Sequence, residues 1–142
     1  MAYLFRQKLN IEELSEPLYR EKRILIYEPE YYLSALYGHY LRSQNFDIKP
    51  CLDLSQVRQA IFVFSPQLLI FSVDAFGSWL KLKPILQGLV ADFPNLNVVS
   101  TGYDLNSDSI KELMEVGVAG HINRRLSRPK DLAVLAQALL NN

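Results

Sequence analysis

The clearest feature of the chain is a series of short apolar runs separated by stretches in which apolar side chains recur at helical spacing. Runs typical of strands lie at 24–27, 46–51, 68–71, 96–100 and 121–123. Between the first two runs the apolar positions follow the i, i+3, i+4, i+7, i+8 pattern of an amphipathic helix, at Leu33, Leu36, Tyr37, Tyr40 and Leu41. Strands alternating with helices in this way predict a parallel sheet of five strands with helices on both faces, a flavodoxin-like three-layer αβα sandwich.

The run at 68–71 carries the strongest expectation about a site. It is continuously apolar and bounded by Ser65 and Pro66 before it and by an acidic loop after it, as expected of a strand covered on both faces. In open α/β sheets, ligands and chemistry gather beyond the carboxyl ends of the strands. Ser72 and Asp74 are therefore candidate site residues.

Signals for helix starts complete the pattern. A second helix is expected over 54–61. Pro84 is placed in the first turn of the third helix, where its missing N–H costs nothing. Ser107 marks the start of the fourth helix, and Ser127 is the expected N-cap of the last one, which runs through Leu140.

Residues 1–22 differ from the rest and are interpreted as an N-terminal arm that precedes a domain over 23–142. Within the arm, Asn10 and Pro17 delimit a short helix with one apolar face. Such a face must be covered, so we expect the arm to pack on its own domain or on a partner, with packing on its own domain preferred.

Composition narrows the function classes. The chain has 142 residues, the length of one domain, and its 15 Lys and Arg balance 15 Asp and Glu, so the total charge does not favour nucleic acid or anionic lipid as a partner. Cys51 is the only cysteine, which excludes an internal disulfide. No apolar segment reaches membrane-spanning length, and no signal peptide is evident. We expect a cytoplasmic protein without a membrane partner.

Neither a metal nor a nucleic-acid site is indicated. His39 and His121 are isolated in the sequence and are interpreted as an ordinary helix residue and a strand side chain. The one basic cluster follows the last predicted strand and is interpreted as a solvated face; it consists of Arg124, Arg125, Arg128 and Lys130. No cofactor is expected either.

Four strings in this order resemble the receiver domain of bacterial two-component response regulators, over roughly residues 23–141. The first strand and its acidic end, 23–30, resemble the family's first strand. The run at 66–72 resembles the strand that carries the phosphoacceptor aspartate. The stretch 98–104 is similar to the one with the switch Thr or Ser, and 117–124 to the glycine-rich stretch that ends in a lysine.

The resemblance places different residues at the family's functional positions. The two carboxylates that help to hold Mg²⁺ fall on Glu28 and Pro29, and the phosphoacceptor falls on Ser72. The lysine falls on Arg124. The switch hydroxyl is matched by Thr101, and the aromatic switch position falls on His121.

These replacements change the chemistry that the resemblance would imply. An acyl phosphate requires a carboxylate nucleophile, and a serine hydroxyl needs a base to activate it. Mg²⁺ usually takes one or two carboxylates, of which Glu28 remains. Asp74 could turn back into the pocket because i and i+2 share a face of a strand, but a loop cap or a solvated carboxylate is preferred. Arg124 suits an ion pair with Glu28 or Asp74 better than a contact to phosphate.

The leading hypothesis is a degenerate pseudo-receiver that acts in signal transduction through protein contacts, without phosphorylation and without enzymatic activity. One alternative is a receiver whose altered site works with Asp74 or Ser72 as acceptor. Another is a small-molecule-binding module of flavodoxin type, for example one for FMN. It lacks support because the first strand-to-helix turn, 28–30, has no glycine with which to cradle a phosphate.

The last predicted helix is apolar in nearly every direction, more than one core-facing stripe needs. Its candidate interaction face comprises Leu132, Val134, Leu135 and Leu139. Exposed apolar faces usually mark interfaces, and the resemblance implies pairing through the helix from 107, the strand 121–123 and the helix 129–140. We therefore expect a protein partner or a homodimer. Coverage of this helix by the N-terminal arm of the same chain is the equally supported alternative.

Overall fold

A computed structural model of the chain describes residues 2–5, 22–74 and 79–141. The strands are β1 (Ala2–Leu4), β2 (Arg23–Tyr27), β3 (Asp47–Cys51), β4 (Leu68–Ser72), β5 (Asn97–Gly102) and β6 (Gly120–Asn123). The helices are α2 (Tyr31–Arg42), η1 (Leu54–Gln56), α3 (Val57–Phe64), α4 (Trp79–Asp92), α5 (Ser107–Val116) and α6 (Pro129–Leu140).

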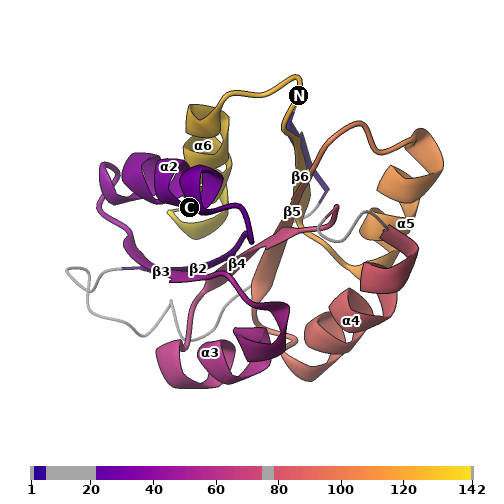
Figure 1. Ribbon diagram of the computed structural model, residues 1–142, viewed down its shortest axis with the longest axis horizontal. Helices are drawn as coiled ribbons and strands as arrows, with labels where there is room; N and C mark the ends of the chain where they lie inside the picture. The colour runs from indigo at the N-terminus through magenta and orange to yellow at the C-terminus, as the bar shows by residue number, and fades with distance from the viewer. Residues whose placement is uncertain (1, 6–21, 75–78, 142) are drawn as a thin grey trace.

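The elements form three layers around one sheet with the strand order β1-β6-β5-β4-β2-β3. Strands β2 to β6 are parallel to their neighbours, whereas β1 is antiparallel to β6. Helices α2 and α6 cover one face of the sheet, and α3, α4 and α5 cover the other (Figure 1). The predicted flavodoxin-like sandwich with five parallel strands is therefore confirmed.

Strand β2 shows why these sequences form a central sheet. Leu25 and Tyr27 point to the face covered by α3, α4 and α5, whereas Ile24 and Ile26 point to the face covered by α2 and α6. All four are completely buried, which is why a continuous apolar run, rather than an alternating one, marks this strand.

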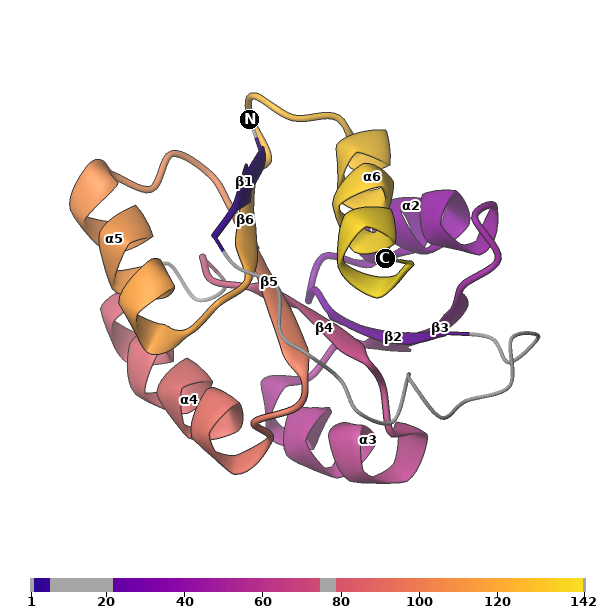
Figure 2. The ribbon, with the colours of Figure 1, turned by 180° about the vertical axis from the view of Figure 1, so that it is seen from behind.

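The N-terminus adds a sixth strand that sequence patterning did not reveal. Ala2 pairs with Ile122 and Leu4 with Gly120 in antiparallel register, and the Phe5 N–H donates to the Ala119 carbonyl at 2.7 Å. Figure 2 shows β1 lying along β6 at the edge of the sheet. The helix expected between Asn10 and Pro17 lies outside the described residues.

Helix α4 begins earlier than the sequence predicted. Pro84 lies inside the helix rather than in its first turn, because the helix is anchored one turn earlier by Trp79, whose buried indole N–H donates to Glu112 of α5 at 2.8 Å. The missing N–H of Pro84 leaves the carbonyl of Leu80 without its helical donor. Both residues are exposed, so water can bond to that carbonyl.

The predicted interaction face on α6 is wrong for three of its four residues. Leu132, Leu135 and Leu139 are buried within the chain, and only Val134 is exposed, at 67%. The physical reason is that α6 packs against α2 as well as the sheet and also contacts β1. Most of the apolar side chains of this helix are therefore buried within the chain.

Candidate functional site

The candidate site lies at the carboxyl ends of β2, β4, β5 and β6. Glu28 follows β2, Ser72 ends β4, and Arg124 follows β6. The register aligns Ser72 with Thr101 of β5, and the Arg124 N–H donates to the Gly102 carbonyl at 2.9 Å. Parallel pairing thus brings together residues from four separate parts of the sequence.

The guanidinium of Arg124 occupies the centre of this site. It donates one hydrogen bond from Nη1 to Oε1 of Glu28 and another from Nη2 to Oδ1 of Asp74. Nη1 also lies 3.4 Å from Oγ of Ser72. The side chain of Arg124 is only 6% exposed, so a fixed internal cation bridges the two carboxylates.

Every oxygen of the two carboxylates accepts a hydrogen bond from the protein. The second oxygen of Glu28, Oε2, accepts from the Glu30 N–H at 2.9 Å. Oδ1 of Asp74 also accepts from the hydroxyl of Ser72 at 3.1 Å, and Oδ2 accepts from the Tyr103 N–H at 2.9 Å. Together with Arg124, these donors direct both carboxylates at groups of the chain itself.

Asp74 therefore does turn back into the pocket, which was the less favoured interpretation of the sequence. Its bond to the Tyr103 N–H also holds the start of the loop after β5, so the same carboxylate acts as a loop cap. Strand β4 ends at Ser72, but the Val73 N–H still donates to the Thr101 carbonyl at 2.9 Å, which keeps the chain beside β5 as it bends at Val73 and Asp74.

The first strand-to-helix turn contributes only one side chain to the pocket. Pro29 is exposed and offers no ligand, and Glu30 caps α2 by accepting hydrogen bonds from the N–H groups of Tyr32 and Leu33. A free helix N-terminus is a common phosphate site. Here the Glu30 carboxylate already accepts the hydrogen bonds that a phosphate would accept at this helix N-terminus, which weighs against the alternative of a phosphate-binding module.

Burial and charge work against each other in the ion-paired cluster. Burial raises the pKa of the Glu28 carboxyl, while the Glu30 N–H and the charge of Arg124 work to lower it. Burial alone would lower the pKa of Arg124, but the hydrogen bond to Asp74 and the charge of Glu28 outweigh it and raise that pKa. The arginine therefore stays charged.

Two site residues were not identified from the sequence, and both act on predicted ones. The ring of Tyr103 lies over the Arg124 guanidinium, with 4.4 Å between the ring centroid and Cζ, and closes the pocket from above as a cation–π partner. Oγ of Ser100 lies 2.7 Å from Nδ1 of His121. Tyr103 belongs to the stretch 98–104 that resembles the receiver family, but nothing in the sequence distinguishes a tyrosine that covers the pocket from an ordinary loop tyrosine.

Thr101 and His121 are buried beside the ion pairs without joining them. The Thr101 hydroxyl has no hydrogen-bond partner among the described residues, and neither has Nε2 of His121. Burial, with a contribution from the charge of Arg124, lowers the pKa of His121 to about 4. This histidine is therefore neutral near pH 7, and its ring serves as an uncharged core side chain.

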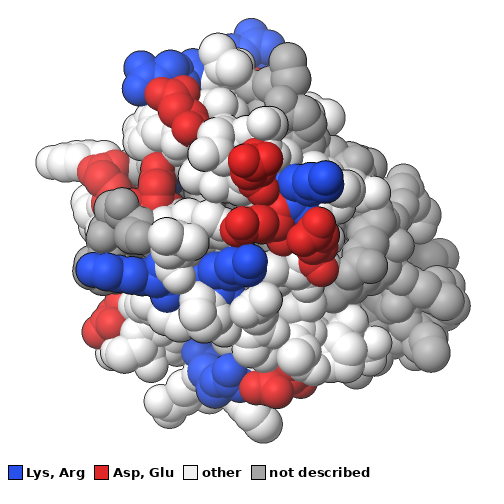
Figure 3. Space-filling model, turned by 90° about the vertical axis from the view of Figure 1, so that its right-hand side faces the viewer, with Lys and Arg blue, Asp and Glu red and all other residues white. Residues whose placement is uncertain are grey.

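The remaining surface does not suggest another charged site. Arg125 pairs with Asp104 at 2.6 Å, and Arg128 lies 4.0 Å from Asp131, so part of the basic cluster is neutralised locally. Figure 3 shows a face on which groups of both signs lie side by side. Within the described residues, no group of three or more His, Cys, Asp or Glu side chains could hold a metal ion. No helix there is long and apolar enough to cross a membrane.

Comparisons with known proteins show the fold. No family model and no curated protein matches the sequence. Among solved structures, a response regulator from Thermotoga maritima is similar over 87% of this chain and 100% of its own, with a TM-score of 0.77 and 11% identity. An orphan response regulator of H. pylori is similar over 84% of this chain and 96% of its own, with a TM-score of 0.74 and 15% identity.

A third similar structure is an atypical orphan response regulator, described as revealing a phosphorylation-independent regulatory mechanism. It covers 84% of this chain and 95% of its own, with a TM-score of 0.72 and 15% identity. The chain therefore has the fold of response regulator receiver domains, as the resemblance in the sequence implied.

Proposed function

We propose that this chain is a signalling domain of receiver type that works through protein contacts and accepts no phosphoryl group. The observation that carries the proposal is the Arg124 guanidinium, bonded to both Glu28 and Asp74. An internal cation at this place neutralises the carboxylates that a divalent cation would need. The phosphorylation-independent mechanism described for one structural neighbour points in the same direction.

Competition with a metal ion supports the proposal. Mg²⁺ binds oxygen ligands in near-octahedral order and gives up its waters reluctantly. To bind here it would have to displace Arg124 from Glu28 and Asp74 and leave the guanidinium charge buried without a partner, which is costly. Since Mg²⁺ neutralises charge during phosphoryl transfer, a pocket closed in this way lacks a main requirement of that chemistry.

The two candidate acceptors are also poorly placed for the reaction. The Ser72 hydroxyl donates to Oδ1 of Asp74 at 3.1 Å, but that oxygen also accepts from Arg124 and is not free to take a proton. Asp74 has both oxygens bonded. A nucleophile that must first give up an ion pair loses much of its reactivity.

A second candidate function keeps one specific observation in its favour. Asp74 does lie in the pocket beside Ser72, 23% exposed at its side chain. If Arg124 swings away, Asp74 becomes an accessible carboxylate at the end of the central strand β4, and the domain becomes a receiver with a displaced acceptor.

The two functions are separated by titrating the protein with beryllium fluoride and Mg²⁺ while recording amide chemical shifts. An inert pocket predicts no shift at Asp74, Tyr103 or Arg124 beyond what Mg²⁺ alone causes. A working site at Asp74 predicts saturable shifts at these amides, which disappear in Asp74→Ala.

The surface around the pocket supports a role in protein contacts. Tyr31 and Tyr32 at the start of α2 are 66% and 81% exposed and stack edge to face, and Tyr103 is half exposed. Aromatic side chains are enriched at protein interfaces. Self-association through α5, β6 and α6 has less support than the sequence implied. Most apolar side chains of α6 are buried, and β1 pairs with the edge of β6, so less apolar surface is free for a second copy.

A further inference from the structure

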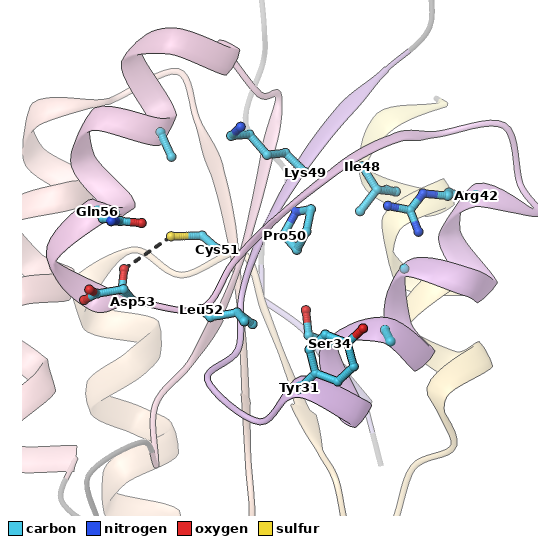
Figure 4. Close-up of a pocket in the computed structure, with 13 residues that line it drawn as sticks. Tyr31, Ser34, Arg42, Ile48, Lys49, Pro50, Cys51, Leu52, Asp53 and Gln56 are labelled. Atoms are coloured by element: carbon cyan, nitrogen blue, oxygen red, sulfur yellow. Dashed lines mark hydrogen bonds between the residues drawn. The ribbon is translucent and has the colours of Figure 1, made fainter.

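A groove follows the outer edge of β3, on the side of the molecule away from β6. Its volume is about 550 Å³, and its walls come from α2 on one side and from η1 and α3 on the other. Figure 4 shows Pro50 of β3 in the middle, with Arg42 and Ser34 of α2 on one side and Gln56 of η1 on the other. An occupant of this groove must straddle the edge of the sheet.

The backbone of β3 presents hydrogen-bonding groups to this groove. The Asp47 N–H donates to the Lys22 carbonyl, and the Cys51 carbonyl accepts from the Glu28 N–H. Alternate residues of a parallel strand direct their backbone groups at the same neighbour, so Ile48 and Pro50 direct theirs away from β2. No described strand pairs with that edge. It offers the N–H and carbonyl of Ile48 and the carbonyl of Pro50.

Proline limits the length of any strand that pairs here. Pro50 has no N–H, so a ladder along β3 would contain one residue opposite Ile48 that both donates and accepts, and one further donor to the Pro50 carbonyl. Edge prolines of this kind prevent extended sheet growth between molecules. The edge is therefore suited to a short extended segment and not to a long strand.

Two cations without an ionic partner in the described structure mark the groove. Arg42 folds over Gly38, where a Cβ would lie 3.1 Å from its Nη1, and Lys49 extends from β3 on the opposite face. Neither forms an ion pair with a described carboxylate, whereas Asp53, the acidic residue of the lining, accepts from both the N–H and the hydroxyl of Ser55. With Arg42 and Lys49 against Asp53, the described lining of the groove carries one more positive than negative charge.

We propose that this groove binds a short acidic segment of a partner protein, in extended conformation, along the edge of β3. Its backbone bonds to Ile48 and to the Pro50 carbonyl, and its carboxylates pair with Arg42 and Lys49 on the two faces of the sheet. Ser34 lines the same groove, but its hydroxyl is buried and is not counted among the groups that contact the segment. Backbone bonds supply affinity in this mode of recognition, and side-chain pockets supply specificity.

The test uses two fluorescein-labelled pentapeptides, Val-Glu-Glu-Val-Ala and its uncharged counterpart Val-Gln-Gln-Val-Ala, with the 142-residue chain at low salt. Adjacent residues of an extended segment point to opposite faces, so the two carboxylates can reach Arg42 and Lys49. We expect the acidic peptide to bind at least tenfold more tightly and to slow hydrogen exchange at the Ile48 amide. Replacing both cations, Arg42→Gln with Lys49→Gln, should weaken binding at least tenfold. The control is Lys111→Gln with Lys130→Gln, which removes two exposed cations elsewhere and should change binding less than twofold.

Three results would each overturn the proposal. The first is equal binding of the two peptides, the second is an equal loss of binding in the control variant, and the third is an Ile48 amide that exchanges at the same rate with and without peptide. An Ile48 amide protected in the free protein together with a dimeric mass would overturn it in favour of a second copy of this chain as the occupant. The inference deepens the proposed function by naming a partner surface. If the peptides fail to bind and the pocket does not respond to beryllium fluoride, the docking site is refuted but the proposed function is not.

Discussion

Arg124 and Asp74, 50 residues apart in the sequence, form a hydrogen-bonded ion pair across the carboxyl ends of β6 and β4. Glu28 completes the cluster from β2. Because a buried charge is costly without a partner, the arginine and the two carboxylates hold three loops in place at once. The cluster is therefore expected to contribute to stability as well as to block the pocket.

Replacing Arg124 with Gln should reduce the free energy of unfolding by about 3 to 5 kcal/mol, because it leaves Glu28 and Asp74 close together and without their counter-ion. Urea unfolding followed by circular dichroism measures the loss. Arg125→Gln is the matched control, since Arg125 pairs with Asp104 on the exposed surface; there we expect a loss of about 0 to 1 kcal/mol. Similar losses in both variants would mean that the internal ion pairs contribute little.

The acid side of the stability profile should depend on His121. Its pKa is about 4 in the folded chain, against 6.5 for an unperturbed histidine. Between these values the unfolded chain binds a proton that the folded chain does not, so stability falls as the pH falls from about 6.5 to about 4, by about 3 kcal/mol for this group.

This dependence is tested by urea unfolding of the parent chain and of His121→Phe at several pH values. In that variant the loss of stability between pH 6.5 and pH 4 should be smaller than in the parent by about 3 kcal/mol. A profile that is the same in His121→Phe would contradict this account, because it would mean that the folded and unfolded chains bind protons equally at His121.

The hydrogen bond between Trp79 and Glu112 should fix the start of α4 against α5. Glu112→Ala removes the acceptor of the indole N–H and also the 3.4 Å ion pair with Lys83. We expect a lower urea midpoint of unfolding, because the buried indole N–H loses its acceptor, and a change in the fluorescence of Trp79, the only tryptophan. Glu115→Ala, exposed on the same helix, should do neither.

The pairing of β1 with β6 should keep copies of the chain apart. Deleting residues 1–5 uncovers the edge of β6, and unpaired edges favour association. Sedimentation at rising concentration should show a monomer for the full chain and association for the truncated one. A full-length dimer that Val134→Asp dissociates would instead restore the interface predicted on α6.

Much of this fold was predictable because its strands are buried on both faces. The run from Leu68 to Phe71 has one plausible structure, and the helices between such runs follow from their spacing. Boundaries were less certain: Pro84 suggested a helix start, but the indole of Trp79 anchors the helix one turn earlier. A tertiary contact of this kind leaves no local pattern.

The site was predictable in its membership and not in its arrangement. Strand order placed Glu28, Ser72 and Arg124 together, and the fork shape of the guanidinium favoured an ion pair. The direction of Asp74 depended on how far β4 continues, which the sequence leaves open. The surface prediction on α6 failed for a related reason: apolar residues look alike whether their cover comes from the same chain or from another.

The central claim is that Arg124 closes the pocket to phosphoryl transfer. Its most direct test is intact mass spectrometry after incubation with acetyl phosphate and Mg²⁺, with Asp74→Ala and Ser72→Ala alongside. The account predicts that the unsubstituted chain keeps its mass. A stoichiometric gain of one phosphoryl group, abolished by Asp74→Ala or by Ser72→Ala, would contradict it.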